Sequence, residues 1–500
     1  MRLRKWILTS VLCGMLIGCN NPYSSGDRVL VSKFPYDNGF THPDRFQVVV
    51  FKYPGRWGMD RLDGGPMENN TPKNYIKRLL GLPGELLAIF FGRIYRWTPP
   101  GNAPPPFDDL KDGKVDAKAL WHKDYMHIDD NTSRGWFEDG QFEILRKSPR
   151  TMLAMRRIVY DNDYQAKDLK GKGDRWSLDP KSGWKSDSRT GFIHEGKPDG
   201  EVDWLHYQHL VRRDDDVLRV ERKLITDSMA YNNINDRTSS PHWVGDLMIE
   251  CNVEVVEAKG EFRFELSKGI YRYQARWDLA SGQCSLKSIA TNGEEKDLGS
   301  QATSVKTPGN YLLRFANIDA RLTVWVDRAL PFGDGKEYDP PEVRAKKDVD
   351  LEEKLKKLKK ARGGVDDDEK ALVKEILEDR RGPTENDIKR PASIGSKGAP
   401  VKITHVRLWR DTYYTNAPAT HNRSKDYDNT PETWSDPRHW EPLRKQQFAT
   451  MYVQPGHYLC LGDNSQASAD SRDWGLVPER LMLGRALVVY FPLDRIGPIR

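Results

Sequence analysis

"KNYIKRLLGLPGE" runs from Lys73 to Glu85 and places two cations in an apolar, strand-like run that ends in a Gly-Leu-Pro-Gly turn. Successive side chains of a strand point to opposite faces, so one of Lys77 and Arg78 is expected to face an interior. A buried lysine disfavours its charged form and can act as a neutral base near pH 7. The alternative is a lysine on an edge strand, where its charge prevents association with other strands. This stretch alone leaves both interpretations open.

Length and composition indicate a β-rich, multi-domain protein. The chain has 500 residues, which predicts two or three domains. Its 15 tryptophans, 40 glycines and 31 prolines favour strands and turns. The 79 basic and 73 acidic residues leave a net charge of only +6, so we expect no nucleic-acid partner.

Cysteines and histidines argue against a disulfide framework and against a metal site. Of the five cysteines, only Cys251, Cys284 and Cys460 lie beyond the first nineteen residues, and they do not form a paired set. The eleven histidines are scattered without paired ligand spacing. We therefore expect neither a metal nor another cofactor.

The first residues, "MRLRKWILTSVLCGMLIGCNNP", have a basic start and an apolar run from Trp6 to Ile17. The run is shorter than the roughly 20 residues that span a bilayer, but it suits the core of a signal peptide. Its end, Leu16 to Cys19, resembles a bacterial lipobox, which implies that residues 1–19 are a signal peptide and that Cys19 is the lipidation site. Membrane lipid would then hold the protein on the extracytoplasmic face. An uncleaved, short anchor helix is the alternative.

The rest of the chain divides by strand pattern. Residues 22–97 and 450–500 are dense in strands and turns, and residues 98–156, with the Pro/Gly-rich "TPPGNAPPPFDD", are expected to be a linker and boundary region. Residues 157–415 repeat short alternating strands such as "YLLRFANI" and "RLTVWVDRALPFG", which predicts an antiparallel sandwich. Within it, residues 350–382 have the leucine spacing and terminal charges of a helical hairpin lying on the sandwich.

Three stretches resemble the sequence boxes of the bacterial signal peptidase I family. They are "SGDRVLVSKF", "YIKRLLGLPGE" and "GDNSQASADSRDWGLVP", in the order that the family has them. The resemblance covers roughly residues 22–97 and 450–500. It implies a mainly β fold in which a peptidase-type β domain is split by an inserted, jelly-roll-like antiparallel sandwich with a short helical hairpin.

The resemblance also implies roles for particular residues. Lys77 matches the general base, and Ser468 matches the serine that orients the lysine. Asp470 and Arg472 match an ion pair that holds the last box in shape. The turn that opens this box corresponds to Gly462, Asp463 and Asn464. From this comparison we expect Lys77 to be buried with a lowered pKa, and Arg78 to face outward or to pair with an acid.

The nucleophile of the family is not matched. The family has Ser-Met before its Gly-Asp strand, whereas the corresponding stretch here reads "CNNPYSSGD". Alignment on Pro22 puts Cys19 at the nucleophile's place, and alignment on Gly26 puts Gly18 there. A lipidated Cys19 has its sulfur tied up as a thioether. Ser24 and Ser25 are shifted candidates whose alternative role is that of turn residues.

The central sandwich resembles the concanavalin A-like jelly rolls, through "GEFRFELSKGIYRYQARWDLASGQ" and "GNYLLRFANIDARLTVWVDRALPFG". This resemblance implies carbohydrate as a ligand class, and aromatic side chains would suit stacking on sugar, although core packing is their other use.

Two functions follow from the resemblances. In the first, the protein is a membrane-attached serine endopeptidase that processes the signal peptides of exported proteins, with Lys77 as base. In the second, it is a catalytically inactive lipoprotein that uses the peptidase scaffold and the jelly-roll module for binding.

Overall fold

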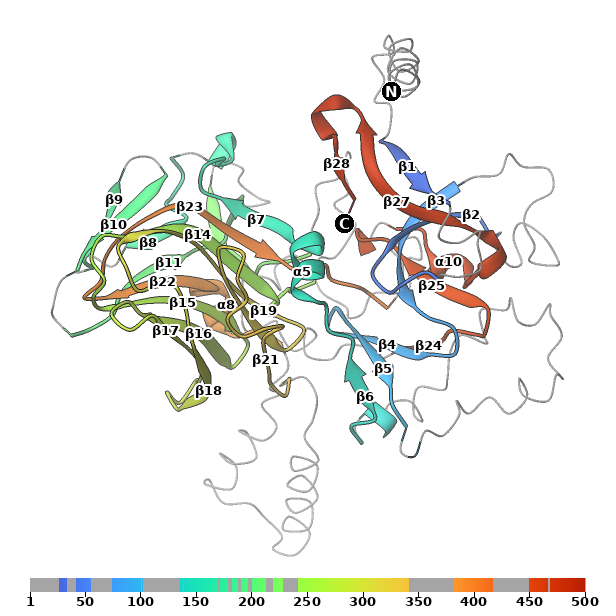
Figure 1. The fold of residues 1–500 in the computed structure, drawn as a ribbon, viewed down its shortest axis with the longest axis horizontal. Coiled ribbons are helices and arrows are strands. Elements are labelled where there is room, and N and C mark those ends of the chain that lie inside the picture. Colours follow the sequence, from blue (N-terminus) through green and yellow to red (C-terminus); the bar gives the residue numbers. More distant parts are fainter. Residues whose placement is uncertain are drawn as a thin grey trace, which may run out of the picture.

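The structure, a computed structural model of the chain, describes residues 27–33, 42–54, 74–99, 101, 135–137, 139–169, 171–178, 182–187, 190–196, 200–212, 219–227, 242–340, 382–416, 449–465 and 468–499. These residues form two β lobes that lie side by side (Figure 1). One lobe takes strands from both ends of the chain, and the other takes strands from its middle. The protein is therefore mainly β, as the sequence predicts.

The terminal lobe is built on an antiparallel sheet in which early and late strands alternate. Its order is β1-β27-β2-β3-β25-β26, and β28 pairs with β27. The strands are β1 (Arg28–Ser32), β2 (Val48–Lys52), β3 (Asn74–Gly81), β25 (His457–Leu461), β26 (Val477–Pro478), β27 (Met482–Phe491) and β28 (Gly497–Pro498). The strand β27 thus lies between two strands that precede it by more than four hundred positions.

A second sheet of the terminal lobe has the order β24-β4-β5-β6. Its strands are β4 (Leu86–Phe90), β5 (Arg93–Trp97), β6 (Phe142–Ile144) and β24 (Ala449–Tyr452). Leu87 and Ile89 of β4 pack against Leu459 and Leu461 of β25, which joins the two sheets through a common core.

Part of the range 98–156 is regular structure and not a linker. The strand β6 pairs with β5, and the helix α5 (Pro149–Met155) follows it. Ser148 caps α5 by accepting a hydrogen bond from the Thr151 amide, and Pro149 occupies the first turn. The buried side chains of Met152 and Met155 hold α5 against the rest of the structure. The prediction of a linker is wrong for these residues because a three-residue strand carries almost no periodic signal of its own.

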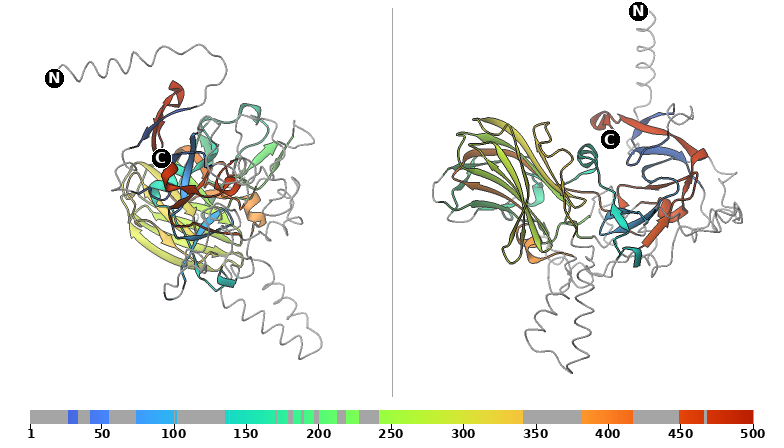
Figure 2. Two further views of the ribbon diagram at one scale, coloured as in Figure 1. Left: turned by 90° about the vertical axis from the view of Figure 1, so that its right-hand side faces the viewer. Right: turned by 60° about the horizontal axis from the view of Figure 1, so that its bottom comes forward.

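The middle lobe is a sandwich of two antiparallel sheets (Figure 2, right). One sheet has the order β21-β20-β19-β14-β23-β10-β9, with β7 also on β23. Its strands are β7 (Arg157–Asp161), β9 (Trp184–Asp187), β10 (Gly191–Glu195), β14 (Leu247–Val255), β19 (Gly309–Ile318), β20 (Arg321–Val326), β21 (Lys336–Glu337) and β23 (Pro400–Arg410).

The facing sheet has the order β18-β17-β16-β15-β22-β11-β8. Its strands are β8 (Trp176–Leu178), β11 (Asp203–Tyr207), β15 (Glu261–Lys268), β16 (Tyr271–Asp278), β17 (Gln283–Ala290), β18 (Glu295–Ala302) and β22 (Ala392–Lys397). A separate pair is formed by β12 (Leu210–Arg212) and β13 (Val220–Arg222). The alternation read from the sequence corresponds to this core: Ile249 and Val253 of β14 and Phe262 and Phe264 of β15 all have no exposed surface.

Helices are few and short in the described part of the chain. They are α5, α8 (Glu385–Lys389) and α10 (Ser471–Trp474), with single turns η4 (Lys167–Leu169), η8 (Glu479–Leu481) and η9 (Leu493–Arg495). None of the described helices is long and apolar enough to span a membrane. The predicted helical hairpin lies outside the described residues up to position 381, as do the signal peptide and Cys19.

Candidate active site

Lys77 lies on β3, in the middle of the sheet of the terminal lobe. The strand is flanked by β2 on one side and by β25 on the other, so it is not an edge strand. The interpretation of Lys77 as an edge guard is therefore wrong. The side chain is half-buried and points to the segment that follows β25.

Lys77 and Ser468 lie at hydrogen-bond distance, although 391 positions separate them in sequence. Lys77 Nζ donates to Ser468 Oγ at 3.1 Å. Burial lowers the pKa of Lys77 below its ordinary value of 10.5, and the nearby Asp470 carboxylate only partly offsets this effect. The arrangement can therefore supply a neutral amine beside a hydroxyl group, which is what a lysine general base requires.

A glycine makes this contact possible. A Cβ atom at Gly462 would lie 2.1 Å from Ser468 Oγ and 3.5 Å from Lys77 Nζ, so no larger residue fits while Ser468 stays in place. The Gly462 amide also donates to Asp470 Oδ2 at 3.0 Å. Gly462 therefore serves the site by its small size and by its backbone N–H group.

Asp470 and Arg472 form a fully buried ion pair behind Ser468. Arg472 donates from Nε and Nη2 to the two carboxylate oxygens of Asp470, at 2.8 and 2.6 Å. Arg472 also donates from Nη1 to the Thr415 carbonyl at 2.9 Å, and from Nη2 to the Ser465 carbonyl at 2.7 Å. Two-point pairing of this kind fixes the path of the segment from residue 462 to residue 472.

Asp463 collects three partners and is more than a turn residue. Arg78 donates to its two oxygens at 2.8 and 2.7 Å, Arg157 donates at 3.0 Å, and Tyr414 donates at 3.3 Å. Burial alone would raise the pKa of Asp463, but these two guanidinium groups and the Tyr414 hydroxyl hold it below the ordinary value. Arg78 is only 4% exposed, so it does not face outward and instead pairs with an acid. Asn464 lies half-buried in the same bend.

The sequence did not reveal Arg157, Tyr414 and Thr415. Arg157 is the first residue of β7, and the other two follow β23, so all three belong to the ends of the inserted sandwich. Their only sequence signal is position, since they stand where the chain enters and leaves the insert. The insert therefore contributes directly to the support of the site.

The sandwich also contains a serine, a histidine and an aspartate in consecutive contact, namely Ser396, His194 and Asp203. Ser396 Oγ lies 3.0 Å from His194 Nδ1, and His194 Nε2 lies 2.8 Å from Asp203 Oδ2. Ser396 is fully buried and donates to the Ala399 carbonyl at 2.8 Å. A substrate cannot reach this hydroxyl group, so the chain of contacts is structural.

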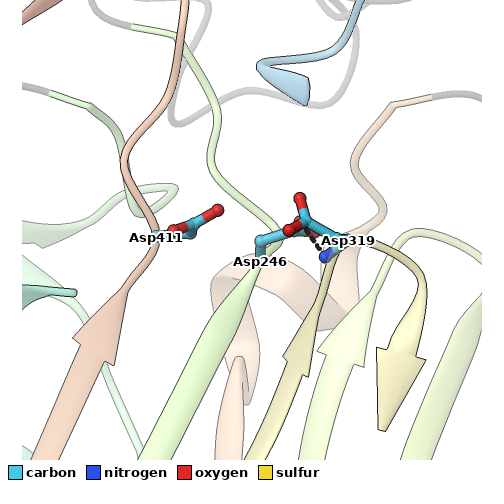
Figure 3. Close-up of side chains that lie close together, drawn as sticks. All are labelled: Asp246, Asp319 and Asp411. Atoms are coloured by element: carbon cyan, nitrogen blue, oxygen red, sulfur yellow. Dashed lines mark hydrogen bonds between the residues drawn. The ribbon is translucent and has the colours of Figure 1, made fainter. Parts of the chain in front are cut away.

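Three buried carboxylates meet where the two lobes join (Figure 3). Asp246, Asp319 and Asp411 offer oxygens that lie within 4.8 Å of one another, a spacing that a metal ion would require. Cations of the protein already bind these oxygens. Lys147 Nζ donates to Asp319 at 2.9 Å and to Asp411 at 2.7 Å. Arg93 donates to Asp246 at 2.7 Å. The cluster is therefore an ion-pair network that links the lobes, and we assign no metal to it.

Comparison with known proteins places the two ends of the chain in one family. The family profile described as "Signal peptidase, peptidase S26" matches residues 18–97 and 372–491. Both matched segments contain site residues, with Lys77 in the first and Ser468 in the second.

Individual relatives match over short stretches. The probable signal peptidase I-2 of Synechocystis sp. is 43% identical over 51 residues, which is 10% of this chain and 23% of that protein. The signal peptidase I of Leptolyngbya laminosa is 40% identical over 53 residues, 11% of this chain and 26% of that protein. The mitochondrial inner membrane protease subunit 1 of Xenopus tropicalis is 43% identical over 49 residues, 10% of this chain and 29% of that protein. The chain thus spans about a quarter of the length of these relatives.

Among solved structures, the carbohydrate binding module CBM66 from Bacillus subtilis aligns with 47% of this chain and 92% of its own, at 8% identity and a TM-score of 0.22. The galectin LEC-6 of Caenorhabditis elegans aligns with 33% of this chain and 83% of its own, at 10% identity and a TM-score of 0.20.

Proposed function

The chain is a divergent member of the signal peptidase I family, and from this premise we propose that it is a membrane-attached serine endopeptidase that cleaves the signal peptides of exported proteins. The observation that carries the proposal is the contact between Lys77 Nζ and Ser468 Oγ at 3.1 Å, made by a lysine whose pKa is lowered by burial. Ser468 orients the amine, and the ion pair behind it holds Ser468 in place.

Lys77 would act twice as a proton carrier. It takes the proton of a serine hydroxyl group while the serine oxygen adds to the scissile carbonyl carbon. The C–N bond then breaks, and Lys77 returns the proton to the leaving amine. Water hydrolyses the acyl ester by the same route, with Lys77 first accepting a proton and then giving it back to the serine oxygen.

The nucleophile of this proposal comes from the stretch 19–25, which lies outside the described residues. Lipidation ties up the sulfur of Cys19, so the hydroxyl group of Ser24 or Ser25 is the nucleophile that the chain offers there. Mass spectrometry of the mature N-terminus should find Cys19 acylated, and Cys19→Ser should release the protein from membranes. An unmodified thiol at Cys19, after Met1 to Gly18, would contradict this assignment.

Exposed apolar side chains support attachment at the extracytoplasmic membrane surface. They lie on β1, which follows the lipidation site closely in sequence, on β27, which pairs with β1, and around η9, which follows β27. Their exposed fractions are 55% for Leu30, 37% for Leu487, 37% for Tyr490, 76% for Leu493 and 56% for Ile496. Exposed apolar side chains on neighbouring elements suit a surface that meets a membrane.

Cleavage of a precursor protein by the full chain in liposomes tests the proposal. Lys77→Ala should lower the rate by about 10²–10⁴-fold, the usual contribution of a general base. Lys52→Ala is the matched control, because Lys52 is an exposed lysine on the neighbouring strand β2. Cleavage that survives Lys77→Ala with an unchanged rate would contradict the proposal.

A second function has one observation in its favour. The sequence has Cys19 or Gly18 where the family has its nucleophilic serine, and loss of such a serine costs on the order of 10⁶ in rate. The protein would then be a non-catalytic lipoprotein that uses the peptidase scaffold for binding. Complete absence of cleavage by a folded, membrane-bound wild-type protein would support this second function.

A further inference from the structure

A cavity of about 920 Å³ lies in the sandwich, between β7 of the eight-stranded sheet and β8 of the facing sheet. Its volume is at the upper end of the range typical of ligand sites. Four successive residues of β7, 158–161, all line it. Successive side chains of a strand point to opposite faces, so a lining that takes every residue follows the edge of the strand and not one of its faces.

The strand β7 has an open edge in the part of the chain that the structure describes. On one side it pairs with β23, and no described strand pairs with its other side. An open edge presents backbone N–H and C=O groups with which another extended chain can pair. Natural edge strands are often protected by lysine or proline, but the middle of β7 is formed by Ile158, Val159 and Tyr160. The edge is therefore suited to pairing.

Apolar side chains accompany this edge. Ile158 is 51% exposed and Tyr164 is 81% exposed, and both line the cavity. Half-buried apolar side chains continue the lining, namely Leu169, Leu178 and Val211. An extended chain presents alternate side chains to each of its two sides, so an apolar residue at every second position could pack on these groups.

The charges of the lining balance. It contains the carboxylates of Asp161 and Asp174 and the guanidinium groups of Arg175 and Arg212. Burial, and then the charge of Arg175, lower the pKa of His209 to about 3, so the imidazole is neutral at physiological pH. A cavity without net charge does not favour a polyanion. A lipid tail does not suit it either, because burying four charged groups against hydrocarbon is costly. The backbone of a peptide is neutral and both donates and accepts hydrogen bonds.

The strand β7 leads from the Lys77 site into the sandwich (Figure 1). Its first residue, Arg157, precedes Ile158 in the lining and donates to Asp463 Oδ2 at 3.0 Å. The Asp463 carboxylate in turn lies near enough to Lys77 to act on its charge. An extended peptide spans about 3.3–3.6 Å per residue, so a polypeptide held at Lys77 needs only a few residues to reach this edge.

We propose that this cavity binds an extended segment of the substrate polypeptide, the part that follows the cleavage site, as a strand added to the open edge of β7. The inference rests on the proposed function, because it takes a precursor protein as the substrate. Main-chain hydrogen bonds to β7 supply affinity, and packing on Ile158 and Tyr164 favours apolar side chains at alternate positions. The sandwich thereby lowers the KM for precursors whose mature part begins with such a stretch.

Cleavage of two substrates by the full chain in liposomes tests the proposal. Both have the same signal peptide and cleavage site, and they continue for about 5 or about 25 residues beyond it. The KM should be about tenfold lower for the longer substrate, at a similar kcat. Ile158→Ala and Tyr164→Ala should each raise the KM of the longer substrate roughly threefold to tenfold and leave that of the shorter one unchanged.

Val256→Ala is the matched control. Val256 is 50% exposed, belongs to the same sandwich and does not line the cavity. This variant should leave the KM of both substrates unchanged.

Direct binding separates this inference from the proposed function. Fluorescence anisotropy of a labelled peptide, with the sequence of the first 25 or so residues of the mature part, measures binding without cleavage. The dissociation constant should be about 100 μM or lower, and Tyr164→Ala should raise it about tenfold. The same peptide N-methylated at alternate residues should bind at least about tenfold more weakly, because it lacks the N–H donors that pair with an edge. If the wild type cleaves neither substrate, the proposed function fails and this titration alone decides the inference.

Three outcomes would overturn the inference. The first is an equal KM for the two substrates, or no binding of the peptide up to about 1 mM. The second is equal affinity for the plain and the N-methylated peptide, which would show that the edge of β7 is not used. The third is a wild-type protein that is dimeric in light scattering while Ile158→Ala is monomeric, since a second copy of the chain would then occupy the edge.

Discussion

At the scale of single residues, the site depends on one position that has no side chain. Gly462 leaves room for Ser468 Oγ, which a methyl group would approach to 2.1 Å. Gly462→Ala should therefore displace Ser468 from Lys77, destabilise the protein by about 1–3 kcal/mol and lower the cleavage rate by about 10²-fold. Denaturant unfolding and precursor cleavage would measure the two effects.

Gly135→Ala is the control for this substitution. A Cβ atom at Gly135 meets nothing within 4 Å, so the variant should keep both its stability and its rate. If Gly462→Ala were as active as the wild type, Ser468 would have no role in orienting Lys77.

The lowered pKa of Lys77 predicts how cleavage varies with pH. The amine must lose its proton before it can accept another, so the rate should rise with pH along a limb whose midpoint lies below 10.5. The unfolded chain holds this proton more tightly than the folded chain does. Charged Lys77 therefore costs stability, which is regained as the pH rises from the lowered pKa to 10.5. A pH–rate profile without such a limb would show that another group is the base.

At the scale of elements, β7 connects the sandwich to the Lys77 site. It pairs with β23 in the sandwich, and its first residue, Arg157, donates to Asp463 beside the Lys77 site. Arg157→Ala removes one of the cations that offset the negative charge of Asp463. Because this negative charge raises the pKa of Lys77, the pKa of Lys77 should be higher in the variant. The limb of the pH–rate profile should then move to higher pH, and the rate at neutral pH should fall about fivefold if the contact is worth about 1 kcal/mol.

A shift of the pH limb distinguishes this electrostatic role from a merely structural one. Arg150→Ala is the matched control, because Arg150 is an exposed arginine on the adjacent helix α5. A lower rate in Arg157→Ala with an unmoved limb would contradict the electrostatic role.

At the scale of the whole molecule, the two lobes are joined by buried charges. Lys147 comes from the terminal lobe, between β6 and α5, and binds Asp319 and Asp411 of the sandwich. Lys147→Met would leave two buried carboxylates without their common cation, which should destabilise the protein by about 3–5 kcal/mol. Lys185→Met, which breaks an exposed pair with Glu195, should cost less than about 1 kcal/mol. Equal effects of the two substitutions in thermal unfolding would show that the network does not join the lobes.

The sequence was informative where a feature is local or follows a long motif. The period of two in strands such as "RLTVWV" was enough to predict the sandwich, and the boxes around Lys77 and Ser468 were long enough to pair two distant segments. The contacts of Asp463 depend on three segments that no local pattern relates, so Arg157 and Tyr414 were missed. The same holds for Lys147, whose partners lie more than 150 positions away.

The position of β27 between β1 and β2 has a consequence for the biosynthesis of the protein. A ribosome delivers β1 and β2 early, but the strand that separates them is among the last segments to emerge. The strands of the sandwich, from β7 to β23, all precede β24 to β28 in the chain, so the sandwich can assemble first. We expect the terminal sheet, and with it the Lys77 site, to close only when synthesis is almost complete. Nascent chains would then carry a finished sandwich before they carry a working site, so the proteolytic machinery would stay unassembled throughout translation.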